Sequence, residues 1–392
     1  MIRIELLVLF LFPSLIPYLI TQPVLVQVIA SMAILIASKG KIFRNIKNVN
    51  AILLLMTLAT LNLLINLDAS GTNIYVRFVL LVLVSSVVVE NIDDDGIKYI
   101  SKIISIIGYF SLVSFLIMSI DGPIGYFQTP NGREYGFTYF GFTTGDVGGL
   151  VKIYRQCGIF EEPGIFGTLC GLFIFRSESK KIEKIGIWAG GIASASLAFI
   201  LIVLIGELSR AKINKLLAVM SGLGMIMVAA ENLGYFDVFK YIIERIAALL
   251  TGSEYGDTRT HVARYILNQE DFINAILKGN LRLLSDPDFG MASIPSLLYV
   301  YGLPSILIGI YLIFWTEFKA KTRYLDVFLI FLVLTQRPNF FEPVYAVAIA
   351  TYLRSAYKSQ GRNNLNQLNF AYQHQRSRGV SGRDKRGVTS GA

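Results

Sequence analysis

Residues 154–175 read YRQCGIFEEPGIFGTLCGLFIF, and they mark the place where a polar part of the chain becomes a long apolar one. Two adjacent acids, Glu161 and Glu162, precede Pro163, and the next charged residue is Arg176. Proline suits the first turn of a helix, where its missing N–H group is not needed. The pattern therefore predicts an apolar helix that begins near Pro163 and carries acidic side chains at its N-terminus.

Apolar stretches of this kind recur along the chain, in which 54% of the residues are hydrophobic, 16% are charged and the mean hydropathy is +0.56. Soluble domains carry about 25% charged residues, so the composition excludes an ordinary soluble enzyme, a secreted disulfide scaffold and a disordered regulator. Because a helix needs about 20 apolar residues to cross a bilayer, we predict an all-α polytopic integral membrane protein with about 12 transmembrane helices. The predicted spans are 4–20, 22–38, 48–67, 72–89, 97–120, 159–175, 215–230 and 293–315, with pairs of short helices in 185–208 and 324–356.

The basic residues predict the orientation of this membrane domain, which covers residues 1–356. Lysines and arginines cluster near 39–47, 176–184, 210–215 and 319–323, and the twelve spans place all four clusters on one side. Short positive loops favour the cytoplasm, so we expect cytoplasmic N- and C-termini. Residues 357–392 hold seven basic residues and one acid, which predicts a basic, disordered cytoplasmic tail, either solvated or in contact with anionic lipids.

Two long loops, 121–157 and a partly helical 231–292, are then extracytoplasmic, and we expect functional residues there because long loops in compact proteins are uncommon without a role. The first loop is rich in glycine and aromatic residues, which would either stack on sugars or form a belt at the membrane surface. Cys157 and Cys170, the only cysteines, are not expected to form a structural disulfide, because one helix carrying both would hold them about 20 Å apart.

The candidate site residues are the ionisable groups near this outer surface. Arg155, Glu161 and Glu162 lie where the first loop ends, either as functional groups or as a helix cap with an ion pair. In the second loop, Arg259 and His261 flank the apolar stripe of a predicted helix. His261 is the only histidine outside the tail, and it is either a structural residue or a catalytic base.

Two further arginines lie at predicted outer helix ends. Arg77 is inside the span 72–89, where it either reaches the lipid headgroups or holds a phosphate. Arg337 precedes the sequence Phe340-Phe341-Glu342-Pro343, which is similar to the Phe-Glu-Glu-Pro sequence at 160–163. We attribute this repetition to similar helix capping rather than to an internal repeat.

The sequence from Arg155 through Gly158-Ile-Phe-Glu-Glu-Pro-Gly-Ile-Phe-Gly resembles the bacterial O-antigen polymerase and ligase superfamily. The layout of about twelve spans, with a large external loop before the last three, is also similar to that family. The resemblance implies a GT-C-like fold in the bacterial inner membrane. It matches Arg259 to the arginine that leads the family's external helix, and Asp288 to an acidic position found in polymerase-like members. The late histidine of the ligases has no counterpart here.

The resemblance implies a transferase that polymerises lipid-linked oligosaccharide repeat units of an O-antigen, capsule or exopolysaccharide. The expected partners are undecaprenyl-diphosphate-linked oligosaccharide as donor and acceptor, membrane lipids and a chain-length regulator, with no nucleic acid. No phosphate-binding loop, dinucleotide fingerprint or Cys/His metal motif occurs, so we expect neither a cofactor nor a metal. One arginine can bind two diphosphate oxygens at once. We therefore assign diphosphate binding to Arg155 and Arg259, with Arg77, Arg337 and Asp288 beside them.

A carboxylate or an imidazole would accept the proton of the attacking sugar hydroxyl. The sequence leaves Glu161, Glu162 and His261 open for this role. The alternative functions are a lipid-linked-sugar flippase or other transporter, and an O-antigen ligase.

Overall fold

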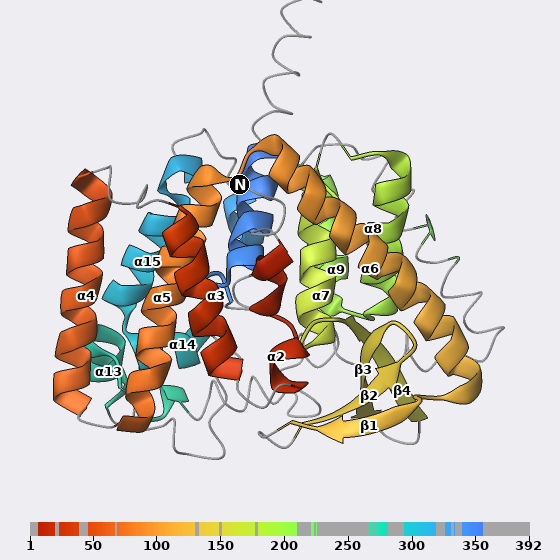
Figure 1. Cartoon of the computed structure of the whole chain (residues 1–392), viewed down its shortest axis with the longest axis horizontal. Helices are drawn as coiled ribbons and strands as arrows, with labels where there is room; N and C mark the ends of the chain where they lie inside the picture. The colour runs from red at the N-terminus through yellow and green to blue at the C-terminus, as the bar shows by residue number, and fades with distance from the viewer. Residues whose placement is uncertain are drawn as a thin grey trace, which may run out of the picture.

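A computed structural model describes residues 7–19, 23–38, 46–66, 69–129, 133–148, 151–176, 179–209, 221–222, 225, 266–269, 271–280, 294–318, 326–330, 333 and 339–355. These residues are mostly helical, with one antiparallel sheet at one end of the helical body (Figure 1). We call that end, where residues 125–158 lie, the sheet end. The opposite end, where residues 91–94 lie, is called the far end.

The helices follow one another from end to end of this body. Near the N-terminus they are short: a 3-10 turn, Leu9–Leu11, and α2, Ile16–Leu19. The longer ones before the sheet are α3 (Pro23–Ala37), α4 (Ile46–Asn66), α5 (Ala69–Asn91) and α6 (Asp94–Asp121). After it come α7 (Pro163–Phe173), α8 (Lys181–Ala193), α9 (Leu197–Ser209), α13 (Phe272–Lys278), α14 (Ile294–Tyr301), α15 (Leu303–Phe318) and a helix over residues 343–355.

Two helical stretches are long and apolar enough to cross a membrane, Ile74–Asn91 in α5 and Asp94–Met118 in α6. A third is reached if α14 and α15, which are bent by 105° at their junction, count as one span. The described residues thus support a helical protein with membrane-spanning segments, whereas the count of twelve stays a prediction.

Two predicted spans are interrupted rather than continuous. The span 4–20 loses its helix between residues 12 and 15, because Leu15 N donates to Ile159 O (3.0 Å) and Pro13 O accepts from Glu161 N (2.9 Å). The span 293–315 breaks at Gly302, whose φ of 75° lies in the left-handed region that glycine occupies without strain.

The predicted division of 185–208 is confirmed. The helices α8 and α9 are separated by a turn at residues 194–196, in which Ala195 has a φ of 43°. In 324–356, residues 326–330 and 343–355 are helical, and residues 334–338 lie outside the described part. Cys157 and Cys170 are both free and buried, as expected.

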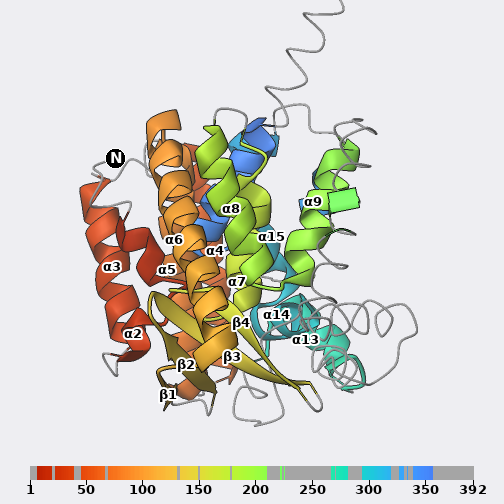
Figure 2. The same cartoon turned by 90° about the vertical axis from the view of Figure 1, so that its right-hand side faces the viewer.

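The all-α prediction is wrong for residues 125–158, which form a four-stranded antiparallel sheet where a loop was expected. Its strands, in the order β1-β2-β3-β4, are Gly125–Gln128, Glu134–Thr138, Gly141–Gly148 and Val151–Gly158. Some aromatic residues of this segment are internal: Tyr135 and Phe142 pack with Leu15 and Cys157 in a small core on one face. The strand β4 contacts α6, α7 and α8, and Figure 2 shows the sheet at the lower end of these helices.

Small residues let α6 and α8 approach closely. Gly186 and Gly190, one helical turn apart on α8, face Gly108 of α6. A Cβ atom on Gly108 would overlap the carbonyl oxygen of Gly186, so the two backbones are in direct contact. Small residues spaced by four are typical of helix pairs in membranes.

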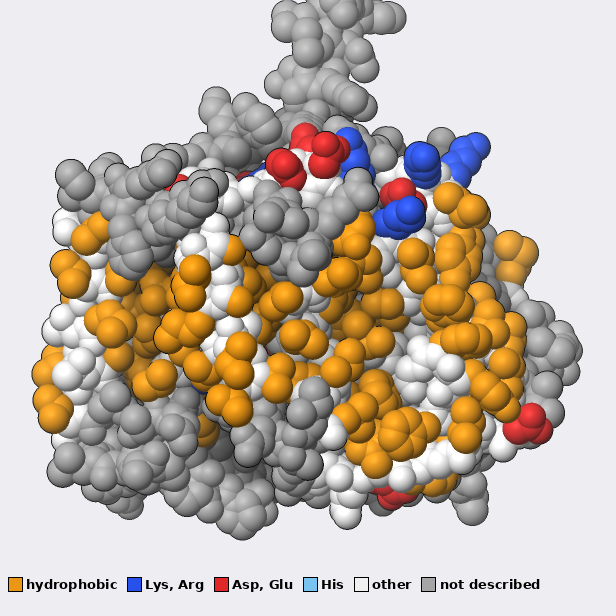
Figure 3. Space-filling model, viewed as in Figure 1, with side chains coloured by type: hydrophobic (Ala, Val, Ile, Leu, Met, Phe, Trp, Pro, Cys, Tyr) orange, Lys and Arg blue, Asp and Glu red, His pale blue; other side chains and the backbone are white. Residues whose placement is uncertain are grey.

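Charged side chains collect at the far end, above a band of hydrophobic ones (Figure 3). Arg354, near the end of the last helix, donates to Glu317 Oε1 (2.7 Å) and to the carbonyl oxygens of Val89 (2.9 Å) and Ile92 (3.2 Å). It thereby joins that helix to α15 and to the C-terminus of α5. The helix α8 separates the basic segment 176–184 from the turn 194–196. Arg155 of the sheet contacts the turn, so the turn lies at the sheet end and the basic segment at the opposite end.

We expect Gly108→Ala to lower the free energy of unfolding by about 1–3 kcal/mol, the usual cost of overpacking, because the new methyl group has only backbone to displace. Thermal unfolding in detergent, followed by circular dichroism, measures this. The matched control is Gly222→Ala, because no described residue lies within 4 Å of the methyl group it would add. Equal melting temperatures for the two variants would contradict the packing described above.

Candidate functional site

The candidate site lies at the sheet end, where β4 leads into α7. Arg155, on β4, is 7% exposed, and its Nε donates to the carbonyl oxygen of Ser194 at 3.3 Å. Its own carbonyl oxygen accepts from Thr143 Oγ1 at 2.8 Å. The sheet and the turn between α8 and α9 therefore hold a buried guanidinium group between them.

The stretch from Ile159 to Glu162 connects β4 to α7, and its backbone is held from two sides. The N-terminal segment pairs with it through the bridge between Ser14 and Phe160. From the sheet, Tyr135 Oη donates to the carbonyl oxygen of Glu161 at 2.8 Å. The first turn of α7 is thus fixed in place, with Pro163 at its first position as the sequence predicts.

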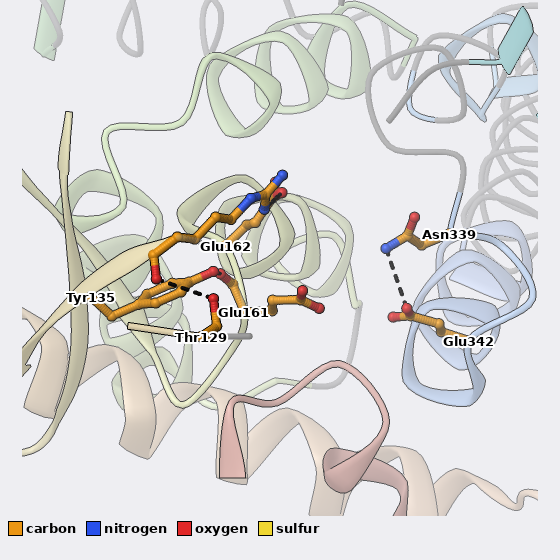
Figure 4. A network of polar contacts seen from close by, with 7 residues as sticks. Thr129, Tyr135, Glu161, Glu162, Asn339 and Glu342 are labelled. Carbon is orange, nitrogen blue, oxygen red and sulfur yellow. Dashed lines mark hydrogen bonds and ion pairs between the residues drawn. The ribbon is translucent and has the colours of Figure 1, made fainter. Parts of the chain in front are cut away.

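The two adjacent acids have different surroundings. Glu162 forms an ion pair with Arg133 at 2.5 Å, and its side chain makes no cap hydrogen bond to α7. The carboxylate of Glu161 points away from the sheet toward Glu342 (Figure 4). Of the predicted helix cap with an ion pair, Glu162 therefore shows the ion pair but not the cap hydrogen bond. The side chain of Glu161 is directed across the sheet end instead.

Glu342 is a further acid at the sheet end, and it was not among the predicted site residues. It is 7% exposed and accepts from Asn339 Nδ2 at 3.3 Å. Like Glu162, it precedes a proline that begins a helix, here Pro343. The similar sequences before Pro163 and Pro343 were the signal that could have identified Glu342. Figure 4 shows Glu161, before the first of these helices, directed toward Glu342 before the second.

Arg77 lies on α5, and the residue that follows it packs against the residue that precedes Glu342. The next residue, Phe78, places its ring 5.4 Å from that of Phe341, which precedes Glu342. The Nε atom of Arg77 is buried and has no hydrogen-bond partner among the described residues, and its charge acts on the nearby Tyr301. Arg77 is only partly exposed, and the choice between the lipid headgroups and a bound phosphate stays open.

The remaining predicted site residues, Arg259, His261, Asp288 and Arg337, lie outside the described residues. The expected proximity of Arg155 to Arg259 therefore stays a prediction. Within the described part of the chain, no three acids, cysteines or histidines are grouped closely enough to hold a metal ion.

Comparison of the chain with protein-family models, with curated proteins and with solved structures returned no match.

The environment of Tyr135 makes the site sensitive to alkaline pH. Burial raises the pKa of its hydroxyl above the ordinary value of 10.0, and the negative charge of Glu161 raises it further. The folded state therefore favours the protonated hydroxyl. This contribution to stability is present below pH 10 and is lost as the pH rises above it, because the unfolded chain then releases the proton.

We expect Tyr135→Phe to lower the free energy of unfolding by about 1 kcal/mol at neutral pH, because it removes one hydrogen bond. The difference from the unaltered chain should shrink when the pH rises to about 11, above the ordinary pKa of tyrosine. Chemical denaturation at a series of pH values measures both effects. Tyr139→Phe, at an exposed ring, is the control and should change the neutral value by less than about 0.5 kcal/mol. If the difference in the free energy of unfolding between Tyr135→Phe and the unaltered chain did not vary with pH, the raised pKa of Tyr135 would be refuted.

Proposed function

We propose that this chain is an inner-membrane glycosyltransferase that joins lipid-diphosphate-linked oligosaccharide units at its sheet end. The observation that supports this most is the position of two helix starts at the sheet end, where the carboxylate of Glu161 is directed toward Glu342 (Figure 4). The buried Arg155 lies at the same end, on β4. A transfer from a diphosphate donor without a metal needs cationic groups for the leaving group and a base for the acceptor.

The proposal includes twelve transmembrane helices, with the sheet end toward the periplasm and both termini in the cytoplasm. Its support is the position of the basic segment 176–184 at the end opposite the sheet, since positive segments favour the cytoplasm. Undecaprenyl-diphosphate-linked units would then reach the sheet end from the outer leaflet.

In the proposed reaction, a hydroxyl oxygen of the acceptor attacks the anomeric carbon of the donor sugar. The bond from that carbon to the phosphate oxygen breaks, and its electron pair leaves with the diphosphate. Arg155 and Arg259 stabilise the negative charge on the diphosphate, with Arg77, Arg337 and Asp288 arranged around the lipid-linked substrate. The hydroxyl proton passes to a base of the protein, and attack from the opposite face inverts the anomeric configuration.

The contacts of the acids refine the choice of base. Glu162 is engaged by Arg133, whereas Glu161 points toward Glu342 across the sheet end (Figure 4). We therefore assign the proton-accepting role to Glu161 or Glu342 ahead of Glu162, with His261 as the competing candidate.

A transporter of lipid-linked sugars is the second candidate function. The 105° bend between α14 and α15 favours it, because broken helices form the binding sites of many transporters. A ligase is the third candidate, and the missing late histidine speaks against it.

Deleting the gene from its host and examining the surface polysaccharide distinguishes the three functions. Loss of long chains with single units retained is the result expected for a polymerase. Loss of all surface units, with lipid-linked units accumulating inside, would indicate a flippase. Long chains that accumulate on the lipid carrier would indicate a ligase.

Arg155→Ala should reduce chain elongation about 10²- to 10³-fold, the usual cost of removing one donor to a developing charge. Arg155→Lys should restore part of the activity, because it keeps the charge but not the paired donors of the guanidinium group. The assay is polysaccharide length by gel electrophoresis, at matched protein abundance. Lys98→Ala, in an exposed ion pair at the far end, is the control. Full-length chains from Arg155→Ala cells would overturn the assignment.

Among the glutamates, either Glu161→Gln or Glu342→Gln should lower the elongation rate about 10²- to 10⁴-fold, as expected for loss of a general base. Glu162→Gln is the matched control, with an expected loss below about tenfold, since its role is to pair with Arg133 rather than to accept a proton. Normal rates in both Glu161→Gln and Glu342→Gln would exclude a carboxylate base and leave His261.

A further inference from the structure

The outward face of α6 carries a row of exposed apolar side chains. Ile106, Val113 and Leu116 are 43%, 43% and 56% exposed, and Phe110 among them is 44% exposed. These residues lie within the stretch Asp94–Met118 that is long and apolar enough to cross a membrane. No charged residue occurs between Lys102 and Asp121.

The same apolar face continues onto the sheet through the turn between β2 and β3. Tyr139 and Phe140, which form this turn, are 56% and 45% exposed. The ring of Phe140 is stacked on that of Phe110, with 4.7 Å between the ring centroids and 22° between the planes. The hydrophobic band in Figure 3 likewise continues from the helices down to the sheet at the lower right.

The stacking fixes the depth of the turn relative to α6. At about 1.5 Å per residue, Phe110 lies about 12 Å along the helix beyond Lys102 and about 16 Å before Asp121. The hydrocarbon core of a bilayer is about 30 Å thick. Where α6 crosses a membrane, Phe110 is therefore well inside the hydrocarbon, and Phe140 lies at the same depth.

The backbone of the turn suits such a position. Lipid offers no hydrogen bonds, so non-helical backbone at that depth has to be covered by protein and to find its partners there. Thr138 pairs with Gly141 across the turn, and the N–H group of Phe140 donates to Thr138 Oγ1 at 3.4 Å. Behind the turn, Thr138 Oγ1 donates to Ser114 Oγ of α6 at 3.3 Å, so the polar side chain next to the turn is directed to the protein.

We propose that the Tyr139–Phe140 turn is inserted into the hydrocarbon of the bilayer, so that the sheet is partly immersed rather than an external domain. The occupant of this apolar face is lipid, because the face is continuous with that of a membrane-crossing helix. The inference does not rest on the proposed enzymatic function, since it would hold equally for a transporter. It implies that β4, which carries Arg155, is held at the lipid boundary by the rest of its sheet.

Site-directed spin labelling of the full chain in vesicles of phosphatidylethanolamine and phosphatidylglycerol tests this. The native cysteines are buried, so a nitroxide can be attached at Phe140→Cys without removing them. The label at 140 should collide with oxygen freely, and its collisions with a water-soluble nickel complex should be about tenfold rarer than in water, because polar solutes are excluded from hydrocarbon. A label at Val113→Cys, on the outward face of α6, should behave in the same way.

The matched control is Glu134→Cys, an exposed position at the end of β2 that is remote from the turn. The nickel complex should collide freely with a label there. Tyr139→Cys provides a second label in the turn that leaves the Phe110–Phe140 stack intact. Nickel collisions at 139 and 140 as frequent as at 134 would overturn the proposal. Spin–spin broadening between labels at 140, which reports a second copy of the chain on this face, would also overturn it.

Discussion

The backbone of residues 159–161 is the constraint on which the sheet end depends. This non-helical segment, in which Phe160 is buried, must find partners for its N–H and C=O groups. Residues 13–15 supply them on one side, and the hydroxyl of Tyr135 supplies one on the other. The N-terminus, the sheet and α7 are thereby joined at one point. The side chain of Glu161 is directed toward Glu342 (Figure 4).

Features with a local cause were predictable from the sequence. Pro163 sets the start of α7 because its fixed backbone angle suits a first turn, and the small residues at 190–196 indicated the turn before α9. The sheet was missed because its glycines and aromatic residues also fit an interfacial loop. The break in the first span was not predictable, because its partner, Ile159, lies far away in the sequence. The break at Gly302 depends on a backbone angle that other residues rarely adopt.

The same distinction applies to the candidate site. Arg155 and Glu161 were found because they flank one short motif. Glu342 was dismissed as a similar cap, because nothing in the sequence brings residue 342 toward residue 161. Tertiary packing does so: the ring of Phe341 contacts that of Phe78, and Ser85 Oγ donates to the carbonyl oxygen of Phe341 at 2.6 Å. These contacts with α5 hold the start of the last helix at the sheet end.

Helix direction relates two acids of the candidate site and Arg354 to the ends at which they lie. The helices α7, α9 and 343–355 all begin at the sheet end, and helix N-termini carry partial positive charge. Glu162 and Glu342 directly precede the first residues of α7 and of helix 343–355, so this charge stabilises the two carboxylates. At the far end, α5 finishes with carbonyl groups that need donors, and Arg354 supplies them. Each of these side chains therefore lies at the helix end whose partial charge is opposite to its own.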